Sequence, residues 1–121
     1  GTLIHELTHA FVADISRGRA PREIHEGLAQ YMEGERIESR LDAEQLALLA
    51  RGQAGGVGGF YLEALAFVEY LMRRRGQAGM NEMLATLGAT ASLEQAFEQA
   101  YGAGYQRTRQ AWRETLQRQH G

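Results

Sequence analysis

Cysteine is absent from the 121-residue sequence, and proline occurs once, at Pro21. The absence of cysteine excludes disulfide bonds and thiolate metal ligands, but it does not identify the compartment. The single proline suits the first turn of a helix, where a missing backbone donor is tolerated. Any metal site must therefore be built from histidine and carboxylate side chains.

Two further classes of feature are missing. The sequence contains no apolar run near the length that spans a bilayer. Its formal net charge is −2, so it has no excess of positive charge for nucleic acid or an anionic membrane surface. No segment alternates convincingly in the manner of a strand. With 44% hydrophobic and 23% charged residues, the composition is typical of a globular protein, and the length fits one domain, residues 1–121.

The N-terminal segment contains the pattern H-E-x-x-H at His5, Glu6 and His9. In a helix with 3.6 residues per turn, the two histidines project from nearly the same line. Two imidazoles in this arrangement can bind one zinc ion. Glu6 lies about a quarter-turn further round, where its carboxylate can reach a metal-bound water. The pattern predicts a catalytic zinc centre that needs a third protein ligand.

Apolar residues follow the same predicted helix, residues 2–16, at spacings of three and four. They are Ile4, Leu7, Phe11 and Ile15, on the side away from the histidines. This spacing predicts that the apolar side faces the core and that the histidine side faces a cleft.

A second helix is predicted over residues 21–33, and it contains E-G-L-A-x-Y beginning at Glu26. A helix with H-E-x-x-H followed by such a helix resembles the gluzincin metallopeptidases, in which the glutamate of the second helix is the third ligand. The resemblance implies Zn²⁺ bound by His5, His9 and Glu26. It also leads us to expect that Gly27 and Ala29 let the two helices pack closely around the ion.

More narrowly, the chain is similar to the bacterial peptidase-MA-like domains, which often continue with a helix ending in V-E-Y-L. Residues 68–71 have this sequence, within a helix predicted over 60–75. The chain begins just before His5, so it reads as the C-terminal part of a gluzincin catalytic domain that lacks its upstream sheet. That sheet would bind the extended substrate, so the sequence leaves open whether the fragment binds zinc or is active without it.

The remaining sequence predicts an all-α fold, a compact bundle of six or seven helices. A charged segment over residues 34–40 is expected to be a loop, and the glycine-rich residues 52–59 should interrupt regular structure. The helix over 60–75 is the most apolar and should be central. The helical remainder, 42–119, is predicted to comprise helices at 43–51, 60–75, 80–87, 93–101 and 105–118.

The function implied is zinc-dependent hydrolysis of a peptide or protein substrate, with Glu6 as general base. By resemblance, Tyr61 is the candidate oxyanion donor. Metal-binding histidines usually donate their other ring N–H to an acceptor. Thermolysin-like members place an aspartate one turn after the glutamate ligand, and here that position is Gln30.

Several alternatives stay open. The chain could be a non-catalytic helical scaffold or interaction module that keeps the peptidase fold. A purely structural zinc site is disfavoured, because it has no use for Glu6 or an open fourth position. His25 is interpreted as a packing or surface residue, because it lies about 100° from Glu26 on the helix. The exposed cleft face could be covered by a second copy in a homodimer. Resemblance alone favours the cell envelope or secretion, and the peptide substrate is not determined.

Overall fold

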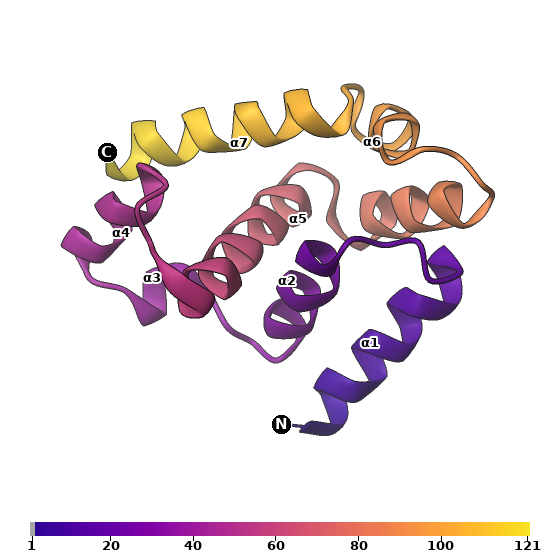
Figure 1. Ribbon diagram of the computed structural model, residues 1–121, viewed down its shortest axis with the longest axis horizontal. Helices are drawn as coiled ribbons and strands as arrows, with labels where there is room; N and C mark the ends of the chain where they lie inside the picture. The colour runs from indigo at the N-terminus through magenta and orange to yellow at the C-terminus, as the bar shows by residue number, and fades with distance from the viewer. Residues whose placement is uncertain (1) are drawn as a thin grey trace.

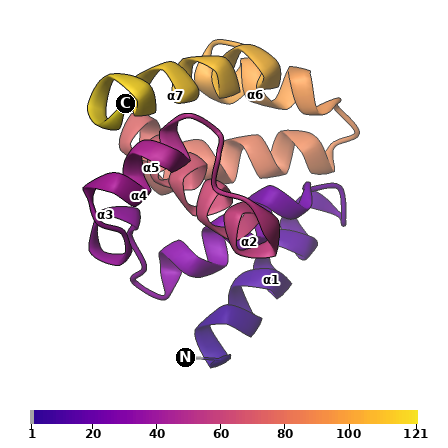
Figure 2. The ribbon, with the colours of Figure 1, turned by 60° about the vertical axis from the view of Figure 1, so that its left-hand side comes forward.

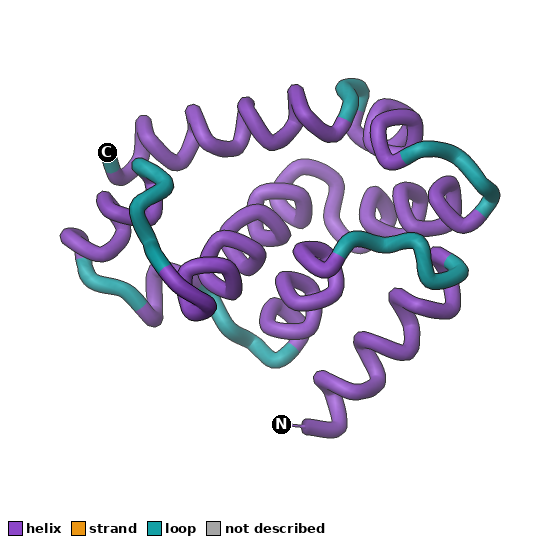
Figure 3. Tube along the Cα trace, in the orientation of Figure 1, coloured by secondary structure: helices purple, strands orange, loops and turns teal. Residues whose placement is uncertain are grey.

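The computed structural model describes residues 2–121, and within this range the chain is all-α, with seven helices and no strand (Figures 1 and 3). This confirms the predicted fold class. The helices are α1 (Thr2–Ser16), α2 (Arg22–Met32), α3 (Ile37–Arg40), α4 (Ala43–Ala50), α5 (Gly56–Gly88), α6 (Leu93–Tyr101) and α7 (Tyr105–His120).

Helix α5 is the centre of the bundle, as its apolar sequence predicts. All residues from Ala64 to Leu71 are buried. Helices α1 and α2 contact α5 on one side, while α6 and α7 cover another side (Figures 1 and 2). The short helices α3 and α4 lie beside the first half of α5. The core is therefore built around one helix on which the others pack.

Helix α5 is interrupted at Gly76, whose φ of 61° and ψ of −157° are not helical. Glycine suits this position because a positive φ has no Cβ penalty there. The first segment thus ends after Arg75, as predicted from the sequence. The predicted turn between Gly76 and Gly79 is absent, because the helix resumes directly after Gly76.

Two segments predicted as irregular are helical. Residues 37–40 form α3, whose first backbone N–H, that of Ile37, donates to the buried carboxylate of Glu69 at 2.8 Å. Helix α5 begins at Gly56, inside the glycine-rich segment. Gly59 is required there, since a Cβ would lie 1.7 Å from the carbonyl oxygen of Ala54. The first error arises from a contact with a residue 32 positions away, whereas the second arises from close packing within the glycine-rich segment itself.

Predicted helix ends agree well elsewhere. Asp42 and Ser92 each form a capping box, with Gln45 and Gln95 respectively. Gly18 has a φ of 73°, and its N–H donates to the carbonyl of Ala13 at 2.8 Å, as a left-handed C-terminal cap should. Local sequence thus determines these ends.

The predicted orientation of α1 is wrong. Ile4, Leu7 and Phe11 are 47%, 60% and 41% exposed, and Ile15 is only partly buried. The residues that face the core are instead Thr8, Val12 and Ser16, spaced four apart. Burial of the two hydroxyls is tolerated because each donates to a carbonyl one turn earlier, Ile4 O at 2.7 Å and Val12 O at 2.6 Å.

This rotation of α1 has a physical cause in its neighbours. The C-terminal end of α1 lies against Gly88 of α5, where a Cβ would be 2.3 Å from the carbonyl oxygen of Ile15. The N-terminal half is turned so that His5 and His9 face α2, with which they make hydrogen bonds and close contacts. Because the histidine side faces the bundle, the apolar stripe is left largely exposed.

Candidate metal centre

One group among residues 2–121 has the composition and spacing of a metal site: His5, His9 and Glu26. Each offers one ligand atom, and the three atoms lie within 4.8 Å of one another. The two Nε2 atoms of His5 and His9 are 3.0 Å apart, and Nε2 of His9 is 3.4 Å from Oε1 of Glu26. All three residues are partly buried. The three residues expected from the sequence are thus together.

These distances fit a zinc ion. Four ligands about 2.0–2.1 Å from zinc in a tetrahedron lie about 3.3–3.4 Å from one another. The measured separations of 3.0 and 3.4 Å are close to that edge length. Zinc commonly binds imidazole nitrogen and carboxylate oxygen, and these are the atoms that the three residues offer. Three protein ligands would leave the fourth tetrahedral position for water or substrate.

Local sequence places the ligands in two steps. His5 and His9 lie one turn apart on α1, and a short connection through Gly18 reverses the chain into α2. Pro21 is the N-cap of α2, with an extended backbone, one residue earlier than a first-turn position. Gly27, beside Glu26, packs against Ala64 and Val68 of α5 rather than against α1. Its expected function of bringing the two ligand helices together is therefore corrected: it seats α2 on the core.

Both ligand histidines have a partner at the other ring nitrogen. Nδ1 of His5 is 2.8 Å from Oε1 of Glu33, and Nδ1 of His9 is 3.1 Å from Nδ1 of His25. A carboxylate can only accept, so His5 donates to Glu33. His25 is not one of the three grouped residues, but it contacts one of them directly.

Gln30, the acceptor suggested by its position in the sequence, has other partners. Its amide nitrogen donates to the carbonyls of Glu26 and Tyr61, at 3.2 and 2.8 Å, and its oxygen accepts from Arg40 at 2.9 Å. The acceptor for His5 lies instead three residues further along, at the C-cap of α2, where Glu33 stands. The sequence signal that could have found it is a carboxylate seven residues after Glu26, two turns along the same face.

The outer partners also have shifted pKa values. The hydrogen bond from His5 lowers the pKa of Glu33, which favours the carboxylate. Burial, and then the neighbouring His9, lower the pKa of His25. Both shifts favour the forms that can accept a hydrogen bond from a metal-bound histidine.

The two predicted catalytic residues lie outside the ligand group. Glu6 is exposed on α1, next to His5. The hydroxyl of Tyr61 accepts from Arg22 at 2.9 Å, and the Arg22 guanidinium also lies 4.8 Å from the ring of Phe60. Because Arg22 stands one turn before Glu26 on α2, Tyr61 borders the helix that supplies the third ligand. Its assignment as oxyanion donor stays a prediction.

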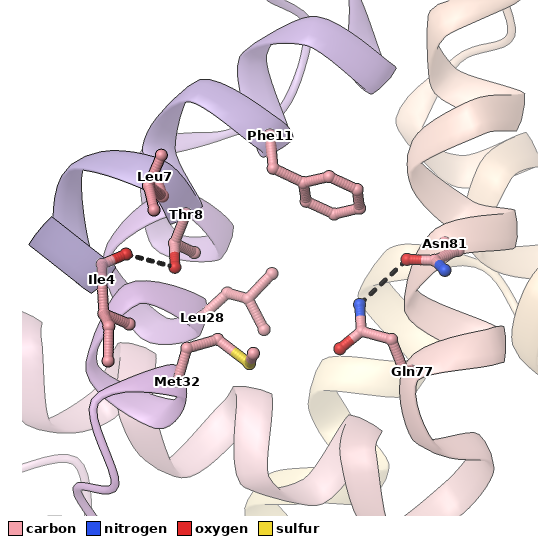
Figure 4. A pocket seen from close by; sticks show the side chains of 8 residues that line it. All are labelled: Ile4, Leu7, Thr8, Phe11, Leu28, Met32, Gln77 and Asn81. Carbon is pink, nitrogen blue, oxygen red and sulfur yellow. Dashed lines mark hydrogen bonds between the residues drawn. The ribbon is translucent and has the colours of Figure 1, made fainter.

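A mainly apolar hollow of about 430 Å³ lies between α1, α2 and the second half of α5 (Figure 4). It is lined by Ile4, Leu7, Thr8, Phe11, Leu28, Met32, Gln77 and Asn81. None of the three grouped residues His5, His9 and Glu26 lines it, and the exposed stripe of α1 forms one of its walls.

No helix in the described part of the chain combines the length and apolar character needed to cross a membrane. Comparisons of the chain with family models, curated proteins and solved structures gave no match.

Proposed function

We propose that the chain carries the metal centre of a gluzincin-type zinc peptidase and hydrolyses peptide bonds. The observation that supports this most strongly is the convergence of two Nε2 atoms and one carboxylate oxygen from two helices, at 3.0 and 3.4 Å. His5, His9 and Glu26 are the residues that would hold the ion. When bound, zinc supplies a Lewis acid and lowers the pKa of water from 15.7 to about 7.

Glu6 is assigned as the general base. It directly follows a ligand, is exposed on the surface of α1 and is not one of the three ligands. Its carboxylate takes a proton from the attacking water and returns that proton to the amine that leaves. Tyr61 donates its hydroxyl to the carbonyl oxygen that becomes negatively charged.

The experiment compares Glu6→Gln with His9→Ala. Zinc content is measured by elemental analysis, and hydrolysis is measured with a peptide library. Glu6→Gln should retain zinc and lose hydrolysis, whereas His9→Ala should lose both, because it removes a ligand.

Full hydrolysis by Glu6→Gln would overturn the mechanism. A folded wild-type protein that takes up no zinc would overturn the proposed function and support the non-catalytic helical scaffold instead.

A further inference from the structure

Four side chains of the site form one continuous hydrogen-bonded series. Glu33 contacts Nδ1 of His5 at 2.8 Å, and Nε2 of His5 contacts Nε2 of His9 at 3.0 Å. Nδ1 of His9 contacts Nδ1 of His25 at 3.1 Å. With no ion between the Nε2 atoms, each link needs one donor and one acceptor to be a hydrogen bond.

Without a metal, the direction of this series is fixed from one end. A neutral imidazole has one N–H and one lone pair, while a carboxylate only accepts. His5 therefore has its proton on Nδ1, facing Glu33, and its Nε2 is an acceptor. His9 must then donate from Nε2, and its Nδ1 accepts from His25. Oxygen Oε1 of Glu26, 3.4 Å from Nε2 of His9, is a second acceptor that favours a proton at that nitrogen.

A bound ion changes one link. Both Nε2 atoms must then offer lone pairs to the metal, so His9 can have its proton only on Nδ1. That N–H points at Nδ1 of His25, which must now accept and carry its own proton on Nε2.

We propose that Glu33 and His25 are positioning residues of the metal centre, and that metal binding switches the tautomers of His9 and His25 while His5 keeps its Nδ1–H. This inference rests on metal binding at the site of the proposed function. We call Glu33, His5, His9 and His25 the imidazole relay.

Protons balance in this switch. His9 loses the Nε2 proton to solvent and gains one on Nδ1, while His25 gives up its Nδ1 proton and takes one from solvent on Nε2. Two protons are lost and two are gained, so the tautomer switch itself releases no net proton. His5 and His9 then each have an outer partner that fixes the orientation of the ring.

The first test is a tautomer measurement. Long-range ¹H–¹⁵N spectra of the 121-residue chain at pH 8 distinguish protonated from unprotonated ring nitrogens. In metal-free protein we expect Nδ1–H on His5, Nε2–H on His9 and Nδ1–H on His25. One equivalent of zinc should leave His5 unchanged and exchange the protonated nitrogens of His9 and His25. If His9 carried Nδ1–H before zinc is added, the proposed tautomer switch would be wrong.

The second test measures zinc affinity by competition with a chelator. Glu33→Ala and His25→Phe should each weaken zinc binding about 10–100-fold, the usual effect of losing an outer partner. Glu33→Gln keeps an acceptor oxygen without the charge, so its loss should be smaller. Glu114→Gln makes the same charge change on an exposed residue of α7 and should have no effect. Circular dichroism checks that each variant is folded.

The outcomes separate the two proposals. Normal zinc affinity in both Glu33→Ala and His25→Phe would overturn the positioning residues, while the proposed function stands. Failure of wild-type protein to bind zinc would overturn the proposed function and the tautomer switch together.

Discussion

Gly27 of α2 lies directly against Ala64 of α5. A Cβ at position 27 would be 2.3 Å from the Ala64 carbonyl oxygen and 2.5 Å from a methyl group of Val68. Real Cβ atoms do not approach a carbonyl oxygen so closely, so only glycine allows α2 to lie at this depth. Because Glu26 is the preceding residue, the same contact sets the position of the proposed third ligand.

Gly27→Ala should therefore lower the free energy of unfolding by about 1–3 kcal/mol, the usual cost of overfilling a packed interface. It should also weaken zinc binding, because α2 must move away from α5. Urea unfolding and chelator competition measure the two effects. Gly58→Ala is the control, since it is a helical glycine with no atom within 4 Å of its added Cβ. Equal effects of the two substitutions would contradict the packing argument.

Zinc should raise the melting temperature of the chain. An ion that binds only the folded state, at a concentration 100 times its Kd, adds about 2.7 kcal/mol of stability. This corresponds to a shift of several degrees for a domain of this size. Differential scanning fluorimetry with zinc and then with EDTA measures the shift and its reversal. Glu26→Ala should melt at the same temperature with and without zinc; a full shift in this variant would exclude Glu26 as a ligand.

The two sides of α1 should respond oppositely to substitution. Val12 is fully buried, so Val12→Ala should cost about 1.5–3 kcal/mol. Leu7 is 60% exposed, so Leu7→Gln should change stability by no more than about 0.5 kcal/mol. Chemical denaturation of both variants tests the orientation of the helix. If Leu7→Gln lowered the free energy of unfolding more than Val12→Ala, the apolar stripe would face the core and the orientation described above would be wrong.

Glu69 should make stability depend on pH. Burial raises the pKa of its carboxyl above the ordinary value of 4.5, although the N–H of Ile37 opposes the shift. As pH rises from 4.5 through the folded-state pKa, the unfolded chain releases this proton first. The free energy of unfolding must then fall, by at most about 1.4 kcal/mol per pH unit for one proton.

Glu69→Gln removes this titration and keeps an oxygen that can accept from Ile37. The stability of the variant relative to wild type should therefore increase as pH rises from 4.5 and level off above the folded-state pKa. Urea unfolding at a series of pH values measures the difference, and Glu114→Gln should show no such trend. A constant difference between Glu69→Gln and wild type would refute the assignment.

Sequence patterns predict what is decided within a few turns of chain. The bounds of α1 and α6 and the caps at Asp42 and Ser92 follow from local hydrogen bonding, and the grouping of His5, His9 and Glu26 agrees with the expectation from two motifs. The end of the first segment of α5 was also predictable, because Gly76 is the residue whose backbone angles are not helical and glycine tolerates them.

Long-range contacts decide what the patterns miss. Helix α3 depends on a carboxylate 32 residues away, that of Glu69. Gln30 is unavailable to His5 because Arg40 and the backbone of Tyr61 occupy its amide group. The rotation of α1 depends on its contacts with α2 and with Gly88. The spacing of apolar residues within α1 contains no information about these contacts.

The close approach of Gly88 to Ile15 has a consequence for the ligands at the opposite end of α1. One end of the helix is fixed to α5 by backbone contact, while the end with His5 and His9 is joined to α2 by side chains. An ion bound by His5, His9 and Glu26 would fix this end of α1 to α2 as well. With both ends fixed, the direction of the helix axis is determined. After chelation that end is held to α2 by side-chain hydrogen bonds alone, so amide hydrogens in the initial turns of α1 should then exchange faster than those near Ile15.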